Sequence, residues 1–216
     1  ALTAQTRSVP RRSGHYNLST HLPWIGERTR SLTGAHVEYF RGIRNPVGVK
    51  IGPKATGEEV VTLCRHLNPQ AEPGRLILIC RMGAGAVSAA LPPIIEAVDR
   101  AKHPVLWMCD PMHGNPSTTS GGIKTRSFDA ICSELEQTCD IHARLGTVLG
   151  GVHFELTGED VTECVGGADG VTEADLSNNY ASLCDPRLNY QQSLEMAFLL
   201  ARRLARPHGH GRTAGA

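Results

Sequence analysis

Charged and metal-ligating side chains follow four short apolar segments of the chain. Lys50, Arg81 and Glu155 each stand at or just past the end of such a segment, and Asp110 and His113 follow another. Any one of these residues alone would most simply be a surface charge in a loop. The carboxyl ends of parallel strands lie at one edge of a sheet. Charged residues that recur at this position after successive strands therefore favour a shared site.

One imidazole and two carboxylates form a candidate metal set: His113, Glu155 and Asp185. These donors are mixed in softness and suit a divalent cation such as Mn²⁺, Co²⁺ or Fe²⁺, with positions left for substrate or water. Their long spacing forms no local metal motif. The alternatives are a core histidine in a turn for His113, an arginine partner for Glu155, and an Asp-Pro turn at Asp185.

Five basic residues form a candidate anion set: Arg28, Lys50, Arg81, Lys124 and Arg126. Guanidinium groups bind phosphate or carboxylate through two hydrogen bonds, and lysine adds a point charge, so the set suits a small phosphorylated acid. For Lys124 and Arg126, in a glycine-rich loop, a solvated surface is an equal alternative. Arg81 ends an apolar strand, where a buried cation needs a partner.

Alternating strands and helices must position these residues. Continuous apolar runs predict buried strands at 46–52, 75–81, 104–110 and 151–156. Helical spacing predicts helices at 56–67, 86–101, 127–145 and 193–204. Thr56 and Glu59 have the spacing of a capping box, and Pro92 and Pro93 predict that the second helix proper begins there. The order is typical of βαβ units, so we expect an α/β fold with a parallel sheet.

Composition narrows the class of protein. The 22 Lys and Arg against 21 Asp and Glu leave a net charge of +1, which argues against nucleic-acid binding by bulk charge. No apolar run approaches the roughly 18 residues that cross a membrane. Seven cysteines without a C-x-x-C pair favour a reducing compartment, so we expect a cytoplasmic protein. We expect a loop or disordered lead-in at 1–14, the folded part at 15–204 and a flexible tail at 205–216.

Seven sequence blocks, ordered between about His15 and Arg203, resemble the class II 3-deoxy-D-arabino-heptulosonate 7-phosphate (DAHP) synthases. They are WIGERTR (24–30), NPVGVK (45–50), RMG (81–83), DPMHGN (110–115), KTR (124–126), TEC (162–164) and CDPRLN (184–189). The resemblance implies a (β/α)8 barrel that condenses phosphoenolpyruvate with erythrose 4-phosphate. This reaction opens the shikimate pathway to chorismate and the aromatic amino acids, and it depends on Mn²⁺, Co²⁺ or a similar metal.

The resemblance also implies roles for individual residues. His113, Glu155 and Asp185 correspond to three of the family's four metal ligands. The phosphoenolpyruvate contacts correspond to Arg28, Lys50 and Arg81, with Glu27 and Trp24 in the same pocket, and erythrose 4-phosphate is the second substrate. His113, Lys50 and Arg81 are therefore the expected catalytic residues.

The resemblance covers only part of the family's pattern. It implies the C-terminal half of the barrel, about five of eight βα units, without the cysteine ligand of the first strand or an N-terminal arginine. Three accounts follow: a fragment of the enzyme, a half-protein that pairs with a separate N-terminal half or with itself, or a shortened relative with another acceptor. A protein that binds metal or phosphate without catalysis is the alternative from another function class. For the localisation, a transit peptide preceding this chain would indicate a plastid instead of the cytoplasm.

Overall fold

The chain forms two compact units in a computed structural model that describes residues 6–8 and 14–205. The first unit is Ala1–Asn115 with Glu134–Phe154, and the second is Pro116–Ser133 with Glu155–Ala216.

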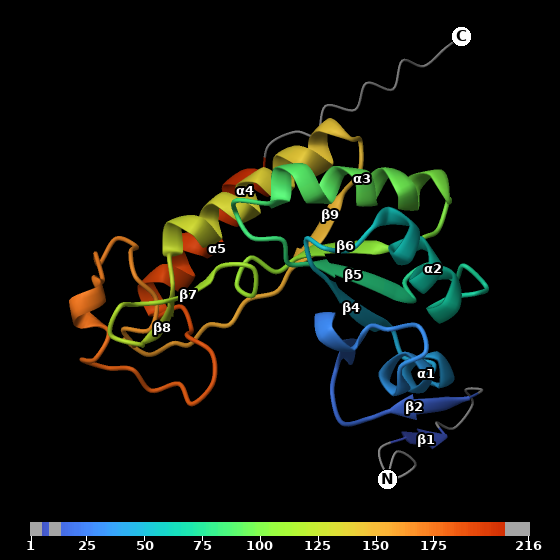
Figure 1. Cartoon of the computed structure of the whole chain (residues 1–216), viewed down its shortest axis with the longest axis horizontal. Coiled ribbons are helices and arrows are strands. Elements are labelled where there is room, and N and C mark those ends of the chain that lie inside the picture. Colours follow the sequence, from blue (N-terminus) through green and yellow to red (C-terminus); the bar gives the residue numbers. More distant parts are fainter. Residues whose placement is uncertain (1–5, 9–13, 206–216) are drawn as a thin grey trace. The chain divides into compact units, whose positions relative to one another are not determined.

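A five-stranded parallel sheet forms the centre of the first unit (Figure 1). Its strands, in spatial order, are β3 (Trp24–Ile25), β4 (Val47–Ile51), β5 (Leu76–Cys80), β6 (Leu106–Cys109) and β9 (Leu149–Val152). All four pairings are parallel, and the order in space follows the order in the chain. The predicted α/β fold with a parallel sheet is confirmed, and within the described residues the sheet is open.

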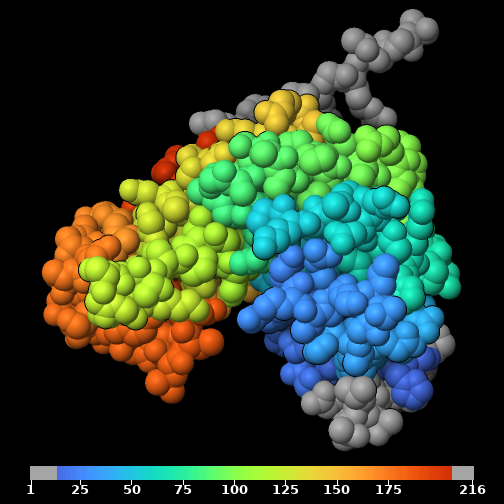
Figure 2. Space-filling view, in the orientation of Figure 1, coloured from blue at the N-terminus to red at the C-terminus, as the bar shows by residue number. Residues whose placement is uncertain are grey.

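Helices α1 (Ala35–Gly42), α2 (Gly57–Leu67) and α3 (Val87–Arg100) lie in the connections between the first four of these strands, β3 to β6. Crossovers that all advance in one direction and share a right-handed sense place their helices on one face of a sheet. Figure 2 shows the surfaces of α2 and α3 in contact without a gap, which agrees with the packing of these two helices. The opposite face of the sheet is therefore available for the side chains that point away from the helices.

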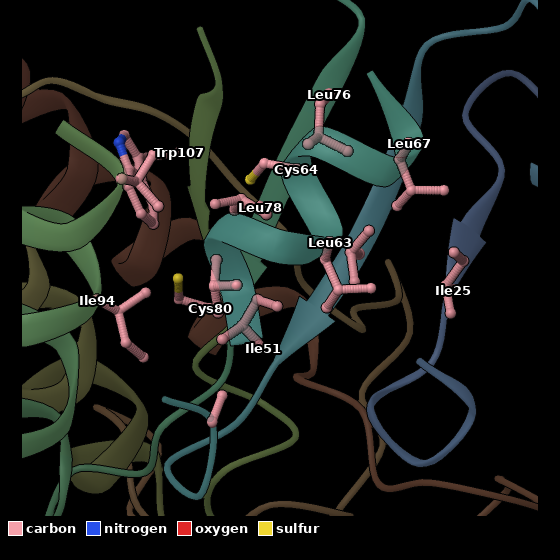
Figure 3. Close-up of a cluster of buried hydrophobic side chains, with 14 of the residues drawn as sticks. Ile25, Ile51, Leu63, Cys64, Leu67, Leu76, Leu78, Cys80, Ile94 and Trp107 are labelled. Carbon is pink, nitrogen blue, oxygen red and sulfur yellow. The ribbon is translucent and has the colours of Figure 1, made fainter. Parts of the chain in front are cut away.

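The apolar core lies between this sheet and its helices. Leu63, Cys64 and Leu67 of α2 share one cluster with Leu76 and Leu78 of β5 (Figure 3). All five residues of β4 and all five of β5 are buried, including those that alternate to the other face. Burial on both faces explains why these strands are continuously apolar in the sequence.

The helix ends test two local predictions. The Thr56 side chain accepts the Glu59 N–H and the Glu59 carboxylate accepts the Thr56 N–H, so the predicted capping box is confirmed. The prediction that the next helix begins at the prolines is wrong, because α3 begins at Val87 and contains both Pro92 and Pro93. Packing of its buried apolar face, including Leu91, compensates for the two missing N–H donors.

The last predicted strand and the last predicted helix are displaced. β9 covers Leu149–Val152 instead of 151–156, because its partner β6 stops before Asp110-Pro111 and the bond from His153 N–H to Cys109 O (2.8 Å) closes the ladder. Helix α5 (Tyr190–Leu204) begins three residues before the predicted start at 193. A capping box of Asn189 and Gln192 defines that start.

The second unit has little regular structure. Strands β7 (Pro116–Thr118) and β8 (Lys124–Arg126) form an antiparallel hairpin, and η3 (Glu173–Asp175) is a short 3-10 turn. Helix α4 (Phe128–Arg144) contributes its first residues to this unit and its remainder to the first. Most of the segment between Glu155 and α5 is loop, so side-chain hydrogen bonds must define its course.

The N-terminal prediction needs one correction. Strand β1 (Thr6–Ser8) pairs antiparallel with β2 (His15–Asn17), so the lead-in predicted at 1–14 is not entirely loop. Residues 1–5 and 9–13, and the predicted tail apart from Ala205, lie outside the described residues. Among the helices of the described residues, none combines the length and apolar character that crossing a membrane requires.

Candidate active site

Lys50 lies on the face of the sheet that points away from the helices. It occupies the fourth position of β4, and only 6% of it is exposed. Its ammonium group pairs with the Asp110 carboxylate and lies 5.9 Å from the centre of the Trp24 ring. A buried cation with an ionic partner and an aromatic neighbour is suited to holding an anion.

Asp110 connects Lys50 to His113. The Asp110 carboxylate is fully buried and accepts the backbone N–H groups of Met112 (3.1 Å) and His113 (3.2 Å). The Nδ1 atom of His113 lies 2.8 Å from the Oδ2 atom of Asp110. Burial acts to raise the pKa of Asp110, but the hydrogen bond with His113 and the charge of Lys50 together lower it well below its usual range. The ionised carboxylate therefore orients the imidazole.

Arg81 and Glu27 lie beside the same loops. The Arg81 Nη2 atom donates a hydrogen bond to His113 O. Glu27 accepts the Gly52 N–H at 2.6 Å and pairs with Arg30 at 3.2 Å. A β carbon at Gly52 would lie 2.9 Å from the Glu27 carboxylate and 3.3 Å from Arg81 Nη1, so Gly52 lets these two side chains approach.

Two aromatic contacts extend the cluster. Trp24 is 47% exposed and meets the His153 ring edge to face at 5.2 Å, and His153 lies 6.1 Å from the His113 ring. Arg28 is exposed in the short 3-10 helix η2 (Glu27–Thr29), next to Glu27. Within the first unit, Lys50 and His113 thus contact the Asp110 carboxylate directly. Three further predicted residues join through neighbours: Arg81 through the His113 carbonyl, Trp24 through Lys50, and Glu27 beside Arg81.

The remaining predicted residues belong to the second unit. Arg126 is 1% exposed, and its Nη1 donates to Glu155 Oε2 at 2.7 Å and to Pro186 O. Its Nη2 lies 3.7 Å from Asp185 Oδ2, and the Lys124 ammonium pairs with the other oxygen of Asp185. The two carboxylates predicted as metal ligands therefore converge on one buried guanidinium.

Glu163, which the sequence analysis did not assign to the site, organises the segment that carries Asp185. It is fully buried and accepts the N–H groups of Ala181, Ser182 and Arg187 at 2.7–3.1 Å. It also accepts two bonds from the Arg187 guanidinium, at 2.7 and 3.0 Å. Burial acts to raise the pKa of Glu163, but these hydrogen bonds lower it overall. An ionised Glu163 therefore fixes the loop around Asp185.

Two residues of the first unit that the sequence analysis did not predict as site residues also lie near the cluster around Asp110. His153 follows β9, and Glu134 lies on α4 with 1% exposure. Glu134 stands three residues after Ile131 and one before Leu135, within the buried apolar stripe of that helix. A carboxylate at such a position is the signal that could have identified it, because buried charges require partners.

An open parallel sheet with cations and carboxylates past its strand ends defines an α/β protein of the kind that binds small anions. The chain belongs to the class-II DAHP synthetase family, whose model matches residues 2–201. It is 54% identical over 196 residues to a phospho-2-dehydro-3-deoxyheptonate aldolase of Neurospora crassa, covering 90% of this chain. An aldolase of the same name from Mycolicibacterium smegmatis is 53% identical over 189 residues, 88% of this chain.

A solved structure gives the same fold. The phospho-2-dehydro-3-deoxyheptonate aldolase of Francisella tularensis matches with a TM-score of 0.56 and 17% identity, over 85% of this chain and 55% of that one. The chain spans about two fifths of the curated relatives, 41% of the first two. Family membership is therefore established for a chain much shorter than these relatives.

Proposed function

We propose that this chain is the part of a DAHP synthase that binds phosphoenolpyruvate and the metal, in the condensation with erythrose 4-phosphate. The relatives named above support this activity. One observation carries the proposal: two cations contact the same Asp110–His113 loop, Lys50 from within β4 and Arg81 from the position directly after the adjacent strand β5. A phosphorylated carboxylic acid is the ligand that such a pair of cations suits.

Phosphoenolpyruvate binds, in this proposal, to Lys50, Arg81 and Arg28. Asp110 holds the Lys50 ammonium and Glu27 lies beside Arg81, so both cations are oriented before the ligand arrives. Because these cations are already in place, they can stabilise negative charge that develops on a substrate, and the protein does not have to reorganise first. The Trp24 ring, whose centre lies 5.9 Å from the Lys50 ammonium, is proposed to shield that ammonium from water.

His113, Glu155 and Asp185 are the proposed ligands of a divalent cation. His113 fits this role, because an imidazole whose one nitrogen faces a carboxylate, here Asp110, has its other nitrogen oriented as a ligand. When bound, such a cation would polarise the aldehyde carbonyl of the acceptor. Lys124, 46% exposed, is proposed to contact the acceptor phosphate, and the buried Arg126 to support this contact while it orients Glu155.

Calorimetric titration of this chain with phosphoenolpyruvate, with and without Mn²⁺, tests the proposal. We expect Lys50→Met and Arg81→Met each to weaken phosphoenolpyruvate binding by about 2 to 4 kcal/mol, the value of a charge-assisted contact in a desolvated site. Arg41→Met is the matched control, because Arg41 forms an exposed ion pair with Glu38 on α1. Equal affinity in all four proteins would remove both cations from the binding site.

The metal set has its own readout. We expect His113→Ala, Glu155→Ala and Asp185→Ala each to lower Mn²⁺ affinity at least tenfold, since each removes one ligand. His103→Ala, which removes a histidine from another part of the first unit, should leave Mn²⁺ binding unchanged. Unchanged Mn²⁺ affinity in the three ligand variants would contradict the assignment.

A further inference from the structure

Two loops of the first unit touch backbone to backbone. Residues 81–86 follow β5 and residues 110–115 follow β6. A β carbon at Gly114 would lie 2.3 Å from Gly83 N, and one at Gly83 would lie 2.8 Å from Gly114 O. Gly83 also has a φ of +89°, which side-chain-bearing residues rarely adopt. No side chain fits between the loops at this point, so a displacement of one loop is transmitted to the other.

Asn115 joins these loops through its side-chain amide. Its Oδ1 accepts the Ala84 N–H at 2.9 Å, and its Nδ2 donates to Pro111 O at 2.7 Å. The same Nδ2 group donates to Glu134 Oε2 at 2.7 Å. The amide thus contacts the loop after β5, its own loop after β6, and helix α4.

Glu134 completes the connection from α4. Its Oε1 accepts the Met82 N–H at 2.7 Å, so its two oxygens bind one loop each. One turn further along α4, the Gln137 side chain donates to Ala84 O at 3.1 Å. Burial raises the pKa of Glu134 to about 7, against hydrogen bonds from Gly83, Met82 and Asn115 that lower it. A buried carboxylate at this position is costly for the fold, but it supplies two acceptors aimed at two loops.

We propose that Glu134 is a positioning residue that, through Asn115, holds Arg81 and His113 in one fixed geometry. The purpose of that geometry rests on the proposed function, because Arg81 and His113 are the proposed phosphoenolpyruvate and metal contacts. Glu134 is assigned no contact with either ligand. The hydrogen bond from Arg81 to His113 O crosses the same two loops, so the loss of Glu134 disturbs both contacts together.

The test combines hydrogen exchange with ligand binding in variants of the whole chain. Glu134→Gln keeps an acceptor for Met82 N–H but turns an amide donor toward the Asn115 donor. Glu134→Ala and Asn115→Ala remove one partner each, and the double variant removes both. Thr138→Val is the matched control, because Thr138 is equally buried on α4 but bonds to Glu134 O and Cys109 and not to the loops.

We expect exchange at the Met82 and Ala84 amides to accelerate about tenfold or more in Glu134→Ala and Asn115→Ala, and exchange at the Ala84 amide to accelerate in Glu134→Gln. Phosphoenolpyruvate affinity should fall by about tenfold in all three variants. The double variant should lose no more than either single alanine variant, since the three groups form one connection. Thr138→Val should retain protected loop amides and full affinity.

Three results would overturn the proposal: protected loop amides in Glu134→Ala, unchanged phosphoenolpyruvate affinity despite faster exchange, or the same losses in Thr138→Val. Losses that simply add in the double variant would also contradict a single connection. If the unmodified chain binds no phosphoenolpyruvate, the proposed function fails, and the exchange comparison alone decides whether Glu134 joins the loops.

Discussion

The two units of this chain hold their proposed site residues by different means. In the first unit, a cluster of buried apolar residues between the sheet and its helices fixes β4, which contains Lys50, and β5, which Arg81 follows. In the second unit, Glu155 and Asp185 lie on loops whose course depends on the buried side chains of Arg126 and Glu163. An apolar core tolerates the loss of one contact, whereas a buried ion pair that loses one partner leaves an uncompensated charge.

Removal of Glu163 should give the largest effect. Glu163→Ala leaves the Arg187 guanidinium and three N–H groups without their acceptor, and we expect the second unit to lose about 4 kcal/mol of its stability. Hydrogen exchange should accelerate across residues 181–187 and remain slow in β4 and β5. Similar acceleration in β4 and β5 would show that the stability of the first unit depends on Glu163 as well, which contradicts the comparison.

The pH dependence of the first unit should differ from that of the second. Burial lowers the pKa of His142 to about 4, so its contribution to stability is lost as the pH falls from 6.5 to 4. Burial raises the pKa of Glu134 to about 7, so its contribution is lost as the pH rises from 4.5 to 7. Each shift corresponds to about 3 kcal/mol, and the two largely offset one another.

Replacing Glu134 or His142 singly should reveal the pH dependence of stability that the other residue causes. In Glu134→Gln the stability of the first unit should fall with decreasing pH below 6.5, and in His142→Gln it should rise with decreasing pH below 7. In the second unit the lowered pKa of Glu163 means that stability is lost as the pH falls below the ordinary range of a glutamate. Urea unfolding followed by exchange at several pH values measures all three, and identical pH slopes in both variants would contradict the assignment.

The smallest effects concern the capping boxes of α2 and α5. Thr56→Ala on α2 should cost about 1 kcal/mol, as for an exposed cap. Asn189→Ala on α5 should cost more, about 2 kcal/mol, because Asn189 and Gln192 are buried and Gln192 also donates to Cys164 O and Gly166 O. Thermal unfolding of the two variants compares them, and equal costs would mean that burial adds nothing to the cap in the second unit.

The difference between an apolar core in the first unit and buried polar contacts in the second also explains which features the sequence could predict. The strands around Lys50 and Arg81 are apolar runs with a helical period between them, and burial on both faces of a sheet produces that pattern directly. The partners of Glu163 lie 18 to 24 residues away on loops without a period, so no local pattern indicates them. The β9 boundary was wrong for a related reason, because it depends on where the neighbouring strand β6 ends.

Some site features fall between these cases. Asp110 and His113 are three positions apart in the sequence and follow a predicted strand, so their proximity could be expected. The bond from Arg81 to the His113 carbonyl and the Glu134 contact to two loops depend on tertiary packing across 32 and 52 residues of chain. Conversely, an arginine partner for Glu155 was one of the alternatives that the sequence left open, and the structure provides that partner in Arg126.

The most direct measurement places this chain in the context of a longer relative. The matched segment of the Neurospora crassa aldolase, 54% identical over 196 residues, would be replaced by this chain, and phosphoenolpyruvate consumption with erythrose 4-phosphate would be followed with and without chelator. We predict turnover that chelator abolishes and Mn²⁺ or Co²⁺ restores, and that His113→Ala eliminates. A folded chimera without turnover, or with turnover that neither chelator nor His113→Ala affects, would contradict the proposed function.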